Sequence, residues 1–385
     1  MHSKQGASLS SNPISVFQYL WIVNSNMATK QLRIYSKKNF EELKAVTCDL
    51  MLRTVHVKSE LGDMALCCTT WMPHNVGNIN ETTILEYLRS ETHKNILATS
   101  MDGTFSYCDK EICPEIQRYL KTGSSGAMSP VETAQKTLDK KFLFIIFTYD
   151  KSCNLQCPSC RNELFIQKTY SDEFKKTHAN MLRSLDELLA EGYKLGLCIT
   201  GSGDPFVSKA YKEILKSYRN TGDYKFFINS NGVLLTQKVL EWENIQHRAK
   251  SFDISIDAYT EDTYNIVRKG GSFSKLKRNL TNLNQQISAG FFSNSVNFQT
   301  NFIVSATNFR EMADFVKWQI NDFENLSRTW LNCIADWGHF KPGQFKSLTV
   351  WDKDHPDHAE FLKILEDPIF KHPKVHLGNL SKFVK

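Results

Sequence analysis

The sequence lacks a hydrophobic stretch long enough to cross a membrane. A spanning helix needs about 20 apolar residues in succession, and no run in the 385 residues approaches that length. An excess of charge of one sign is also absent, because 47 lysines and arginines are balanced by 41 aspartates and glutamates. A net charge of +6 without a visible basic stripe does not indicate a nucleic-acid partner. We therefore exclude an integral membrane protein and do not expect a nucleic-acid-binding one.

The N-terminus lacks the features of a secretion signal. Its most apolar part, residues 14–23, has few basic residues before it and no small-residue cleavage site after it. The ten cysteines do not suggest a disulfide framework, since such frameworks normally stabilise much smaller secreted chains. Most of them lie in two local clusters, which in a cytosolic chain is typical of metal ligands. We expect a cytoplasmic protein that binds metal through cysteine.

Changes in composition divide the chain into five segments. The first is rich in Ser and Asn, the second carries cysteines and a helix near residues 82–93, and the third contains the Gly, Ser and Pro of a linker. The last segment is charged and shows no clear periodicity. The expected segments are an extension (1–36), a cysteine-rich domain (37–120), a linker (121–138), a main domain (139–345) and a tail (346–385).

In the main domain, short apolar runs alternate with amphipathic stretches, which is typical of a parallel β/α architecture. Six such strands are fewer than the eight of a closed TIM barrel, so the pattern is compatible with an open six-strand barrel or a doubly wound sheet. The expected strands are 142–147, 195–200, 224–230, 252–257, 296–304 and 330–335, and the expected helices are 171–191, 210–218, 235–243, 260–267, 273–289 and 309–321.

Three cysteines follow the first expected strand. Cys153, Cys157 and Cys160 are separated by three and two residues. Thiolates suit iron–sulfur clusters, and three at this spacing can bind three corners of a four-iron, four-sulfur cube. The fourth iron would then be open to bind a substrate, by the same logic as an open catalytic zinc site. The loops that follow the strands carry the chemistry of β/α barrels. On spacing alone, the cysteines could also form half of a zinc site.

This C-x3-C-x2-C motif resembles that of the radical S-adenosylmethionine (radical SAM) superfamily. The resemblance implies an open (β/α)6 partial TIM barrel over about residues 140–340, with a [4Fe-4S] cluster on the three cysteines. The residues Ser202, Gly203, Asp204 and Pro205 resemble the family's Gly-Gly-Glu-Pro motif, which holds the methionyl amino group of SAM. Asp204 replaces the glutamate and keeps a carboxylate of shorter reach.

Further motifs resemble those of the family in the same order. Asn229 and Asn231 end the third strand, where relatives often carry Thr-Asn-Gly. Ser255 and Asp257 lie at the end of the fourth strand, where the family binds the ribose hydroxyls. Asn308 ends a loose match to the adenine motif. The resemblance therefore implies that these residues contact SAM.

A second cysteine cluster precedes the main domain. Cys48 and Cys67 are expected to flank a strand pair, and Cys108 and Cys113 to return from the far side of a helix. Four thiolates can complete the ligand shell of a [4Fe-4S] cluster, which suits electron transfer or structure. The same four could hold a structural zinc ion, and Cys68 could take the place of Cys67.

The spacing of this second cluster around Gly62 and residues 77–79 resembles the SPASM/twitch auxiliary-cluster domains of radical SAM enzymes. The resemblance implies a small α+β domain with a second [4Fe-4S] cluster. The order is unusual, because such domains normally follow the radical SAM domain. The cysteines here also suffice for only one auxiliary cluster.

The resemblance implies an oxidoreductase that cleaves SAM reductively to a 5′-deoxyadenosyl radical. The radical would remove a hydrogen atom from a peptide or a small metabolite, and the auxiliary cluster would exchange an electron with the substrate. An external electron donor such as flavodoxin or ferredoxin is the implied partner. The alternatives are a non-enzymatic iron–sulfur electron carrier and a zinc-stabilised interaction protein, although neither has a use for the SAM-contact motifs.

Three further residues have simpler interpretations. Cys198 and Cys333 lie in expected strands, and free cysteine is among the most buried residue types, so we expect both in the core. Arg268 comes just before Gly270 and Gly271 and is interpreted as a cation at a helix C-terminus.

Overall fold

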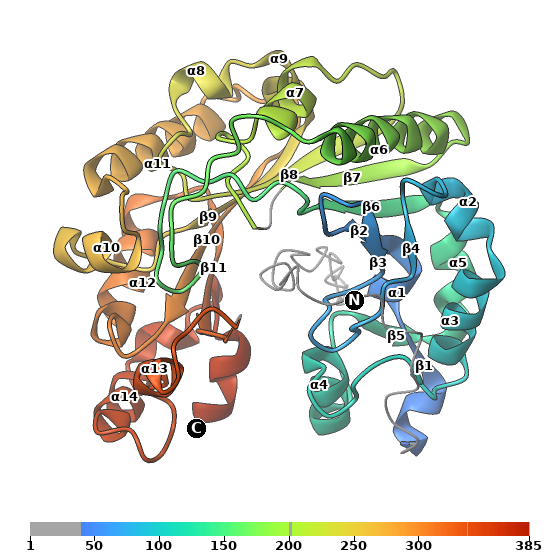
Figure 1. Ribbon diagram of the computed structural model, residues 1–385. Coiled ribbons are helices and arrows are strands. Elements are labelled where there is room, and N and C mark those ends of the chain that lie inside the picture. Colours follow the sequence, from blue (N-terminus) through green and yellow to red (C-terminus); the bar gives the residue numbers. More distant parts are fainter. Residues whose placement is uncertain (1–39, 200–201, 337, 385) are drawn as a thin grey trace, which may run out of the picture.

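The computed structural model describes residues 40–199, 202–336 and 338–384 (Figure 1). The expected N-terminal extension (1–36) lies outside these ranges. None of the helices in the described ranges combines the length and the apolar character that crossing a membrane requires.

A ten-stranded sheet runs through the molecule in the order β12-β11-β10-β9-β8-β7-β6-β2-β3-β4. Its strands β6 to β11 are mutually parallel and follow chain order. Each matches one expected apolar run within a few residues, so the prediction of an α/β fold with a largely parallel sheet is confirmed. The six strands are β6 (Phe142–Phe147), β7 (Lys194–Ile199), β8 (Tyr224–Ser230), β9 (Ala249–Ser255), β10 (Asn297–Val304) and β11 (Leu326–Cys333).

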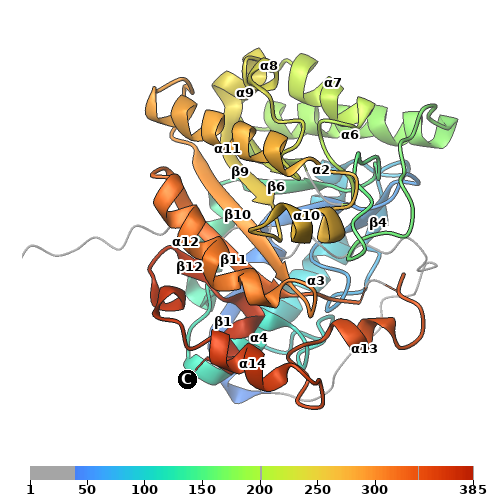
Figure 2. The same ribbon diagram turned by 90° about the vertical axis from the view of Figure 1, so that its left-hand side faces the viewer.

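Helices cover the outer face of this curved sheet (Figures 1 and 2). In β6, Leu143, Ile145 and Phe147 belong to the large core that the helices share, whereas Phe144 and Ile146 form a separate inner cluster with Cys198. The strand thus buries both faces, as expected of a continuous apolar run. The helices are α6 (Asp172–Ala190), α7 (Lys209–Ser217), α8 (Gln237–Leu240), α9 (Glu243–Arg248), α10 (Glu261–Val267), α11 (Phe273–Ser288) and α12 (Met312–Asp322), the last preceded by η4 (Phe309–Glu311).

The expected single helix at 235–243 is wrong, because two short helices, α8 and α9, occupy this region. Trp242 has an extended backbone and caps α9. Its ring packs against Phe206, with ring centroids 6.1 Å apart. The helical pattern is thus interrupted at Trp242.

The N-terminal part joins the same sheet. Strand β2 (Thr54–Val57) pairs in parallel with β6, and β3 (Asp63–Ala65) and β4 (Gly77–Asn78) continue the sheet in antiparallel pairs. A separate two-stranded sheet joins β1 (Val46–Cys48) to β5 (Met128–Pro130). The hydrogen-bonded ladder thus connects the expected cysteine-rich domain directly to the main one.

Short helices surround these strands. The expected helix near 82–93 is divided at Ser90, which ends one helix and caps the next. The segment expected as a linker, 121–138, contains β5 and most of a helix. The helices are η2 (Glu41–Ala45), α1 (Asp49–Arg53), α2 (Ile84–Arg89), α3 (Glu91–Met101), α4 (Pro114–Thr122), η3 (Val131–Thr133) and α5 (Ala134–Asp139).

The C-terminal segment packs on the opposite end of the sheet. Its strand β12 (Val375–His376) pairs in parallel with β11, and Phe361, Phe370 and Leu380 are buried. The expected tail is therefore part of the core, although its sequence shows no clear periodicity. Its helices are α13 (Gln344–Leu348), α14 (His358–Ile364), η5 (Pro368–Lys371) and η6 (Gly378–Phe383). The prediction that Cys198 and Cys333 are buried is confirmed.

Candidate active site

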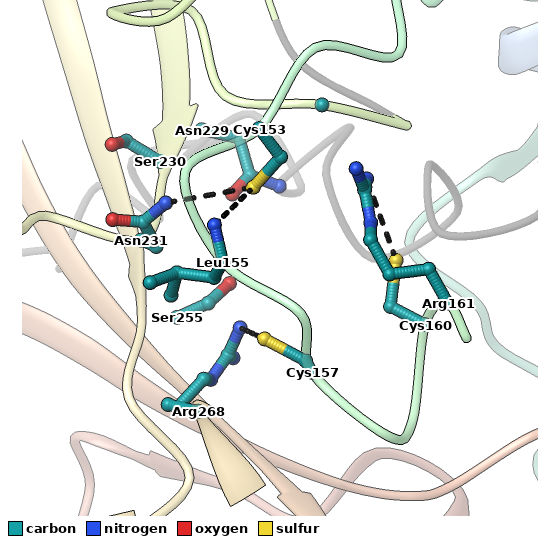
Figure 3. Close-up of a pocket in the computed structure, with 11 residues that line it drawn as sticks. Cys153, Leu155, Cys157, Cys160, Arg161, Asn229, Ser230, Asn231, Ser255 and Arg268 are labelled. Atoms are coloured by element: carbon teal, nitrogen blue, oxygen red, sulfur yellow. Dashed lines mark hydrogen bonds between the residues drawn. The ribbon is translucent and has the colours of Figure 1, made fainter. Parts of the chain in front are cut away.

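Three cysteines and the ends of neighbouring strands surround one cavity (Figure 3). The cysteine loop follows β6, and most of the other lining residues come from the segments that end β7, β8 and β9. Arg268 comes from the end of α10. Because parallel strands present their carboxyl ends at one edge, the topology brings these segments together. The lining residues are Cys153, Leu155, Cys157, Cys160, Arg161, Gly203, Asn229, Ser230, Asn231, Ser255 and Arg268.

Backbone hydrogen bonds fix the shape of the cysteine loop. The Cys153 amide donates to the Phe165 carbonyl at 2.8 Å, and the Gln156 amide donates to the Lys269 carbonyl at 2.9 Å. The Cys160 amide donates to the Cys157 carbonyl at 2.9 Å, which closes a turn. Since these bonds use main-chain atoms, the loop is held in place while its thiols remain on the cavity wall.

Each thiol meets a different donor. Cys153 Sγ accepts from the Leu155 amide at 3.4 Å and from Asn231 Nδ2 at 3.8 Å. Cys157 Sγ accepts from Arg268 Nη1 at 3.7 Å. These donors would stabilise negative charge on the sulfur atoms.

The third thiol faces a second arginine. Arg161 Nη2 lies 3.8 Å from Cys160 Sγ. Its guanidinium also donates to the Lys151 carbonyl at 3.0 Å and to the Ser202 carbonyl. Two of the three thiols are thus each paired with a cation.

The interpretation of the sequence missed both arginines. Arg268 does cap the C-terminus of α10, as expected. Its side chain, however, is buried in the site. Its contact with Cys157 joins residues 111 positions apart, and no local pattern reports such a contact. Arg161 directly follows Cys160, and that adjacency was the available signal.

The thiols fit a metal cluster by their chemistry. Burial, followed by the nearby Asp204 carboxylate, raises the pKa of Cys153 to about 12. Burial also raises the pKa of Cys157, although Arg268 opposes that rise. Ionising these thiols therefore requires a strong positive partner, such as bound iron.

The spacing of the thiols suits a multinuclear group. In a four-iron cluster, each thiolate binds a different iron atom. Three thiols distributed around a cavity fit such a group.

Several expected cofactor contacts line the same cavity, namely Gly203, Asn229, Asn231 and Ser255. The Ser255 hydroxyl is buried and has no hydrogen-bond partner within the described part of the chain. A buried polar atom without a partner is unfavourable, so this hydroxyl fits a site that a polar ligand completes.

Other expected contacts lie behind the wall. Ser202 Oγ donates to the Thr148 carbonyl at 2.9 Å, and Pro205 is buried. The Asp204 carboxylate accepts from Ser230 Oγ at 2.8 Å and from the Asn231 amide at 2.9 Å. Asp204 thereby joins the loops after β7 and β8, and burial raises its pKa.

Asp257 and Asn308 also bond within the protein. Asp257 Oδ2 lies 2.7 Å from Arg268 Nη2, and Oδ1 accepts from the Ile303 amide at 2.7 Å. Asn308 Nδ2 donates to the carbonyls of Asp257 and Ile303, each at 2.8 Å. Neither residue lines the cavity, and their role as SAM contacts stays a prediction.

A second cavity is lined by all four expected N-terminal ligands: Cys48, Cys67, Cys108 and Cys113. Cys68 is buried but is not among the lining residues. The other lining residues are Leu50, Met51, Trp71, Phe105, Glu115, Ile116 and Met128.

The four thiols of this second cavity influence one another. Burial, followed by Cys67, raises the pKa of Cys48 to about 12. Burial also raises the pKa of Cys108, with further contributions from Cys113, Cys48 and Cys67. A cation among them would offset this mutual repulsion, and the donor set fits a metal centre.

Comparison with known proteins finds a match for the part of the chain that lines the first cavity. Residues 151–301 match the family model of the Radical SAM superfamily. None of the curated proteins compared with the chain matches it. One matching solved structure, described as native anSMEcpe with bound AdoMet, is 17% identical with a TM-score of 0.35. The match covers 51% of this chain and 53% of that chain, so this chain spans about half of its length.

The matched residues contain the cysteine loop and every segment that lines the first cavity. Asn308 and the second cavity lie outside them. Residues 151–301, which include the lining of the first cavity, are thus similar to the Radical SAM superfamily.

Proposed function

We propose that the chain is a radical SAM enzyme that cleaves SAM reductively and removes a hydrogen atom from a peptide or small metabolite. The observation that carries the proposal is the cavity in which Cys153, Cys157 and Cys160 meet Asn229 and Ser255. An iron–sulfur electron carrier would not need the polar wall opposite the cysteines.

Cys153, Cys157 and Cys160 would hold a [4Fe-4S] cluster. When bound, such a cluster would supply the single electron that reductive cleavage of SAM requires. The donors from Leu155 and Arg268 orient the thiols and stabilise their negative charge.

The polar wall would orient SAM. Ser255 Oγ is available for a ribose hydroxyl, and Asn229 and Asn231 add amide groups beside it. Asp204 would act indirectly, because its carboxylate accepts a hydrogen bond from the Asn231 amide and so positions Asn231. Because most of the wall is buried, bound SAM would be shielded from water, which protects a radical from side reactions.

The second cavity supports an auxiliary [4Fe-4S] cluster on Cys48, Cys67, Cys108 and Cys113. Four thiols would leave no open iron, so we infer a role in electron transfer to or from the substrate radical. A structural zinc ion is the second candidate, since the same four thiols suit zinc.

The electron donor and the cellular location are proposed from the same chemistry. Reduction of the first cluster requires a one-electron donor protein such as flavodoxin or ferredoxin. All ten cysteines are free of disulfides, which supports a reducing, cytoplasmic location.

The test is anaerobic reconstitution with iron and sulfide, followed by SAM and a strong reductant, with 5′-deoxyadenosine measured by mass spectrometry. We expect wild type to form the product and Cys157→Ala to form none. Cys198→Ala is the matched control, because this thiol belongs to the inner core cluster. Product formation by Cys157→Ala would refute the assignment of the first cavity.

The second cavity is tested by metal analysis. We expect Cys108→Ala to keep SAM cleavage while losing the iron and the absorbance of one cluster. Uptake of one zinc ion in place of that iron would instead support the structural alternative.

A further inference from the structure

Arg268 is a buried cation at the wall of the first cavity. It directly follows α10, and its side chain is only 4% exposed. Burial by itself would lower the pKa of the guanidinium, but Asp257 and Cys157 raise it, and the net direction is upward. A guanidinium stays protonated in proteins, and Asp257 lies within ion-pair distance of this one.

The guanidinium spans two partners. Its Nη1 lies 3.7 Å from Cys157 Sγ, and its Nη2 lies 2.7 Å from Asp257 Oδ2. Figure 3 shows the side chain reaching toward Cys157 from the side opposite Cys160. The arginine thus connects a cysteine of the motif to a carboxylate beyond the cavity wall.

Asp257 is itself firmly placed. Its side chain is 2% exposed, and its backbone has a φ of 63°, which is uncommon for a residue other than glycine. The Ile303 amide and the Asn308 side chain hold it by hydrogen bonds of 2.7 and 2.8 Å. Asp257 can therefore fix the position of the guanidinium.

This arrangement has an electrostatic consequence for a bound cluster. Charges interact more strongly inside a protein than in water. A cation beside a ligand sulfur stabilises the reduced cluster, which carries one more negative charge. The Asp257 carboxylate partly opposes this effect, because it is negative and bound to the same cation.

We propose that Arg268 is a positioning residue that acts through Cys157 and raises the reduction potential of the cluster, while Asp257 holds Arg268 in place and moderates its effect. The inference rests on the proposed function, since it requires a cluster on the three cysteines. It concerns a one-electron step, in which dithionite gives up an electron and the cluster gains it, with no bond in the protein formed or broken.

The test is a redox titration of the full-length, reconstituted protein without SAM, followed by electron paramagnetic resonance. The variants are Arg268→Met, Asp257→Asn and the conservative Arg268→Lys. Arg248→Met is the matched control, because Arg248 is an arginine that packs on Tyr224 and does not line the cavity.

We expect Arg268→Met to decrease the reduced-to-oxidised ratio of the cluster about tenfold at a fixed potential, which equals about 59 mV for one electron. Asp257→Asn should shift the ratio the opposite way, Arg268→Lys should retain most of the wild-type value, and Arg248→Met should leave it unchanged. Opposite shifts in two variants distinguish electrostatic control from general loosening of the site.

An unchanged potential in both Arg268→Met and Asp257→Asn would overturn the inference. If Arg268→Met only weakens SAM binding, measured by calorimetry, Arg268 is a ligand residue instead. If Arg268→Met binds no cluster, the potentials of Asp257→Asn and Arg268→Lys decide the inference. The proposed function fails separately, if the wild type takes up no cluster or produces no 5′-deoxyadenosine.

Discussion

At the scale of single residues, two serines on β9 have similar surroundings and different expected roles. Ser251 and Ser255 are both buried, and neither hydroxyl has a hydrogen-bond partner in the described ranges. Their separation by four positions places both on the same face of the strand. Only Ser255 lines the first cavity, so only its hydroxyl can bond a ligand there.

We expect Ser255→Ala to weaken SAM binding about fivefold, since one hydrogen bond contributes about 1 kcal/mol. Stability should hardly change, because the hydroxyl has no protein partner to lose. Calorimetric titration of the reconstituted protein with SAM measures the affinity. Ser251→Ala is the control, and an equal loss of affinity in both variants would contradict this role.

The sequence predicted that the three cavity cysteines lie together because they fall within eight consecutive residues. It also placed Asn229, Asn231 and Ser255 at strand ends, where the topology brings them to one edge. The bonding of Asp257 was not predictable, because it depends on Arg268, a residue with no distinguishing neighbours in the sequence.

At the scale of elements, the loop after β7 lies directly against the loop after β6. A side chain at Gly203 would overlap the Ser152 carbonyl and lie 2.9 Å from the Asp150 carbonyl. The Asp204 amide donates to the Ser152 carbonyl at 2.8 Å. The absence of a side chain at Gly203 therefore allows one wall of the cavity to support the cysteine loop.

We expect Gly203→Ala to displace the cysteine loop and to lower the free energy of unfolding by about 1–3 kcal/mol, as overpacking does. Iron bound per chain after reconstitution should fall with it. Gly290→Ala is the control, because nothing lies within 4 Å of its added methyl group and only its backbone is strained. Full iron binding by Gly203→Ala would show that the loops tolerate separation.

Elements were predictable where burial is continuous. The expected runs 142–147 and 224–230 match β6 and β8 to the residue, because most of their side chains are buried. The breaks at Ser90 and Trp242 were not predictable. The sequence has a helical pattern on both sides of each break, and the break itself depends on capping at Ser90 and on packing at Trp242.

At the scale of the whole molecule, the pairing of β2 with β6 joins the N-terminal part to the parallel strands β6 to β11. The register runs from Thr54 opposite Phe144 to Val57 opposite Phe147. Composition suggested a linker after residue 120, but composition does not report which strands pair. We infer that the two parts stabilise each other.

We expect a chain that begins at residue 139 to show no cooperative transition in urea, because β6 loses the hydrogen-bonding partner along one side. A chain that begins at residue 37 should unfold in one transition, followed by circular dichroism. A sharp transition in the shorter chain would show that the part with strands β6 to β11 folds independently.

Stability should also depend on pH through His56. Its Nε2 lies 2.5 Å from Thr148 Oγ1, and burial lowers its pKa from 6.5 to about 3. Between these values the unfolded chain binds a proton that the folded chain does not, so the free energy of unfolding falls as the pH falls.

This histidine should contribute a loss of about 1 kcal/mol between pH 7.5 and pH 5.5, from about 1.4 kcal/mol per pH unit below the unfolded pKa. We expect His56→Gln to have a smaller pH dependence than wild type, measured by urea unfolding at both pH values. His247→Gln, at an exposed position, is the control. An identical pH dependence in wild type and His56→Gln would rule out this contribution.

The ends of the long sheet have a consequence for the behaviour of the protein at high concentration. Within the described ranges, its outermost strands, β4 (Gly77–Asn78) and β12 (Val375–His376), are two residues each. Unpaired edge groups are templates for pairing with another chain, and short edge strands limit such pairing. The two outermost strands therefore offer few backbone groups to a second molecule, which opposes intermolecular β-sheet aggregation through them.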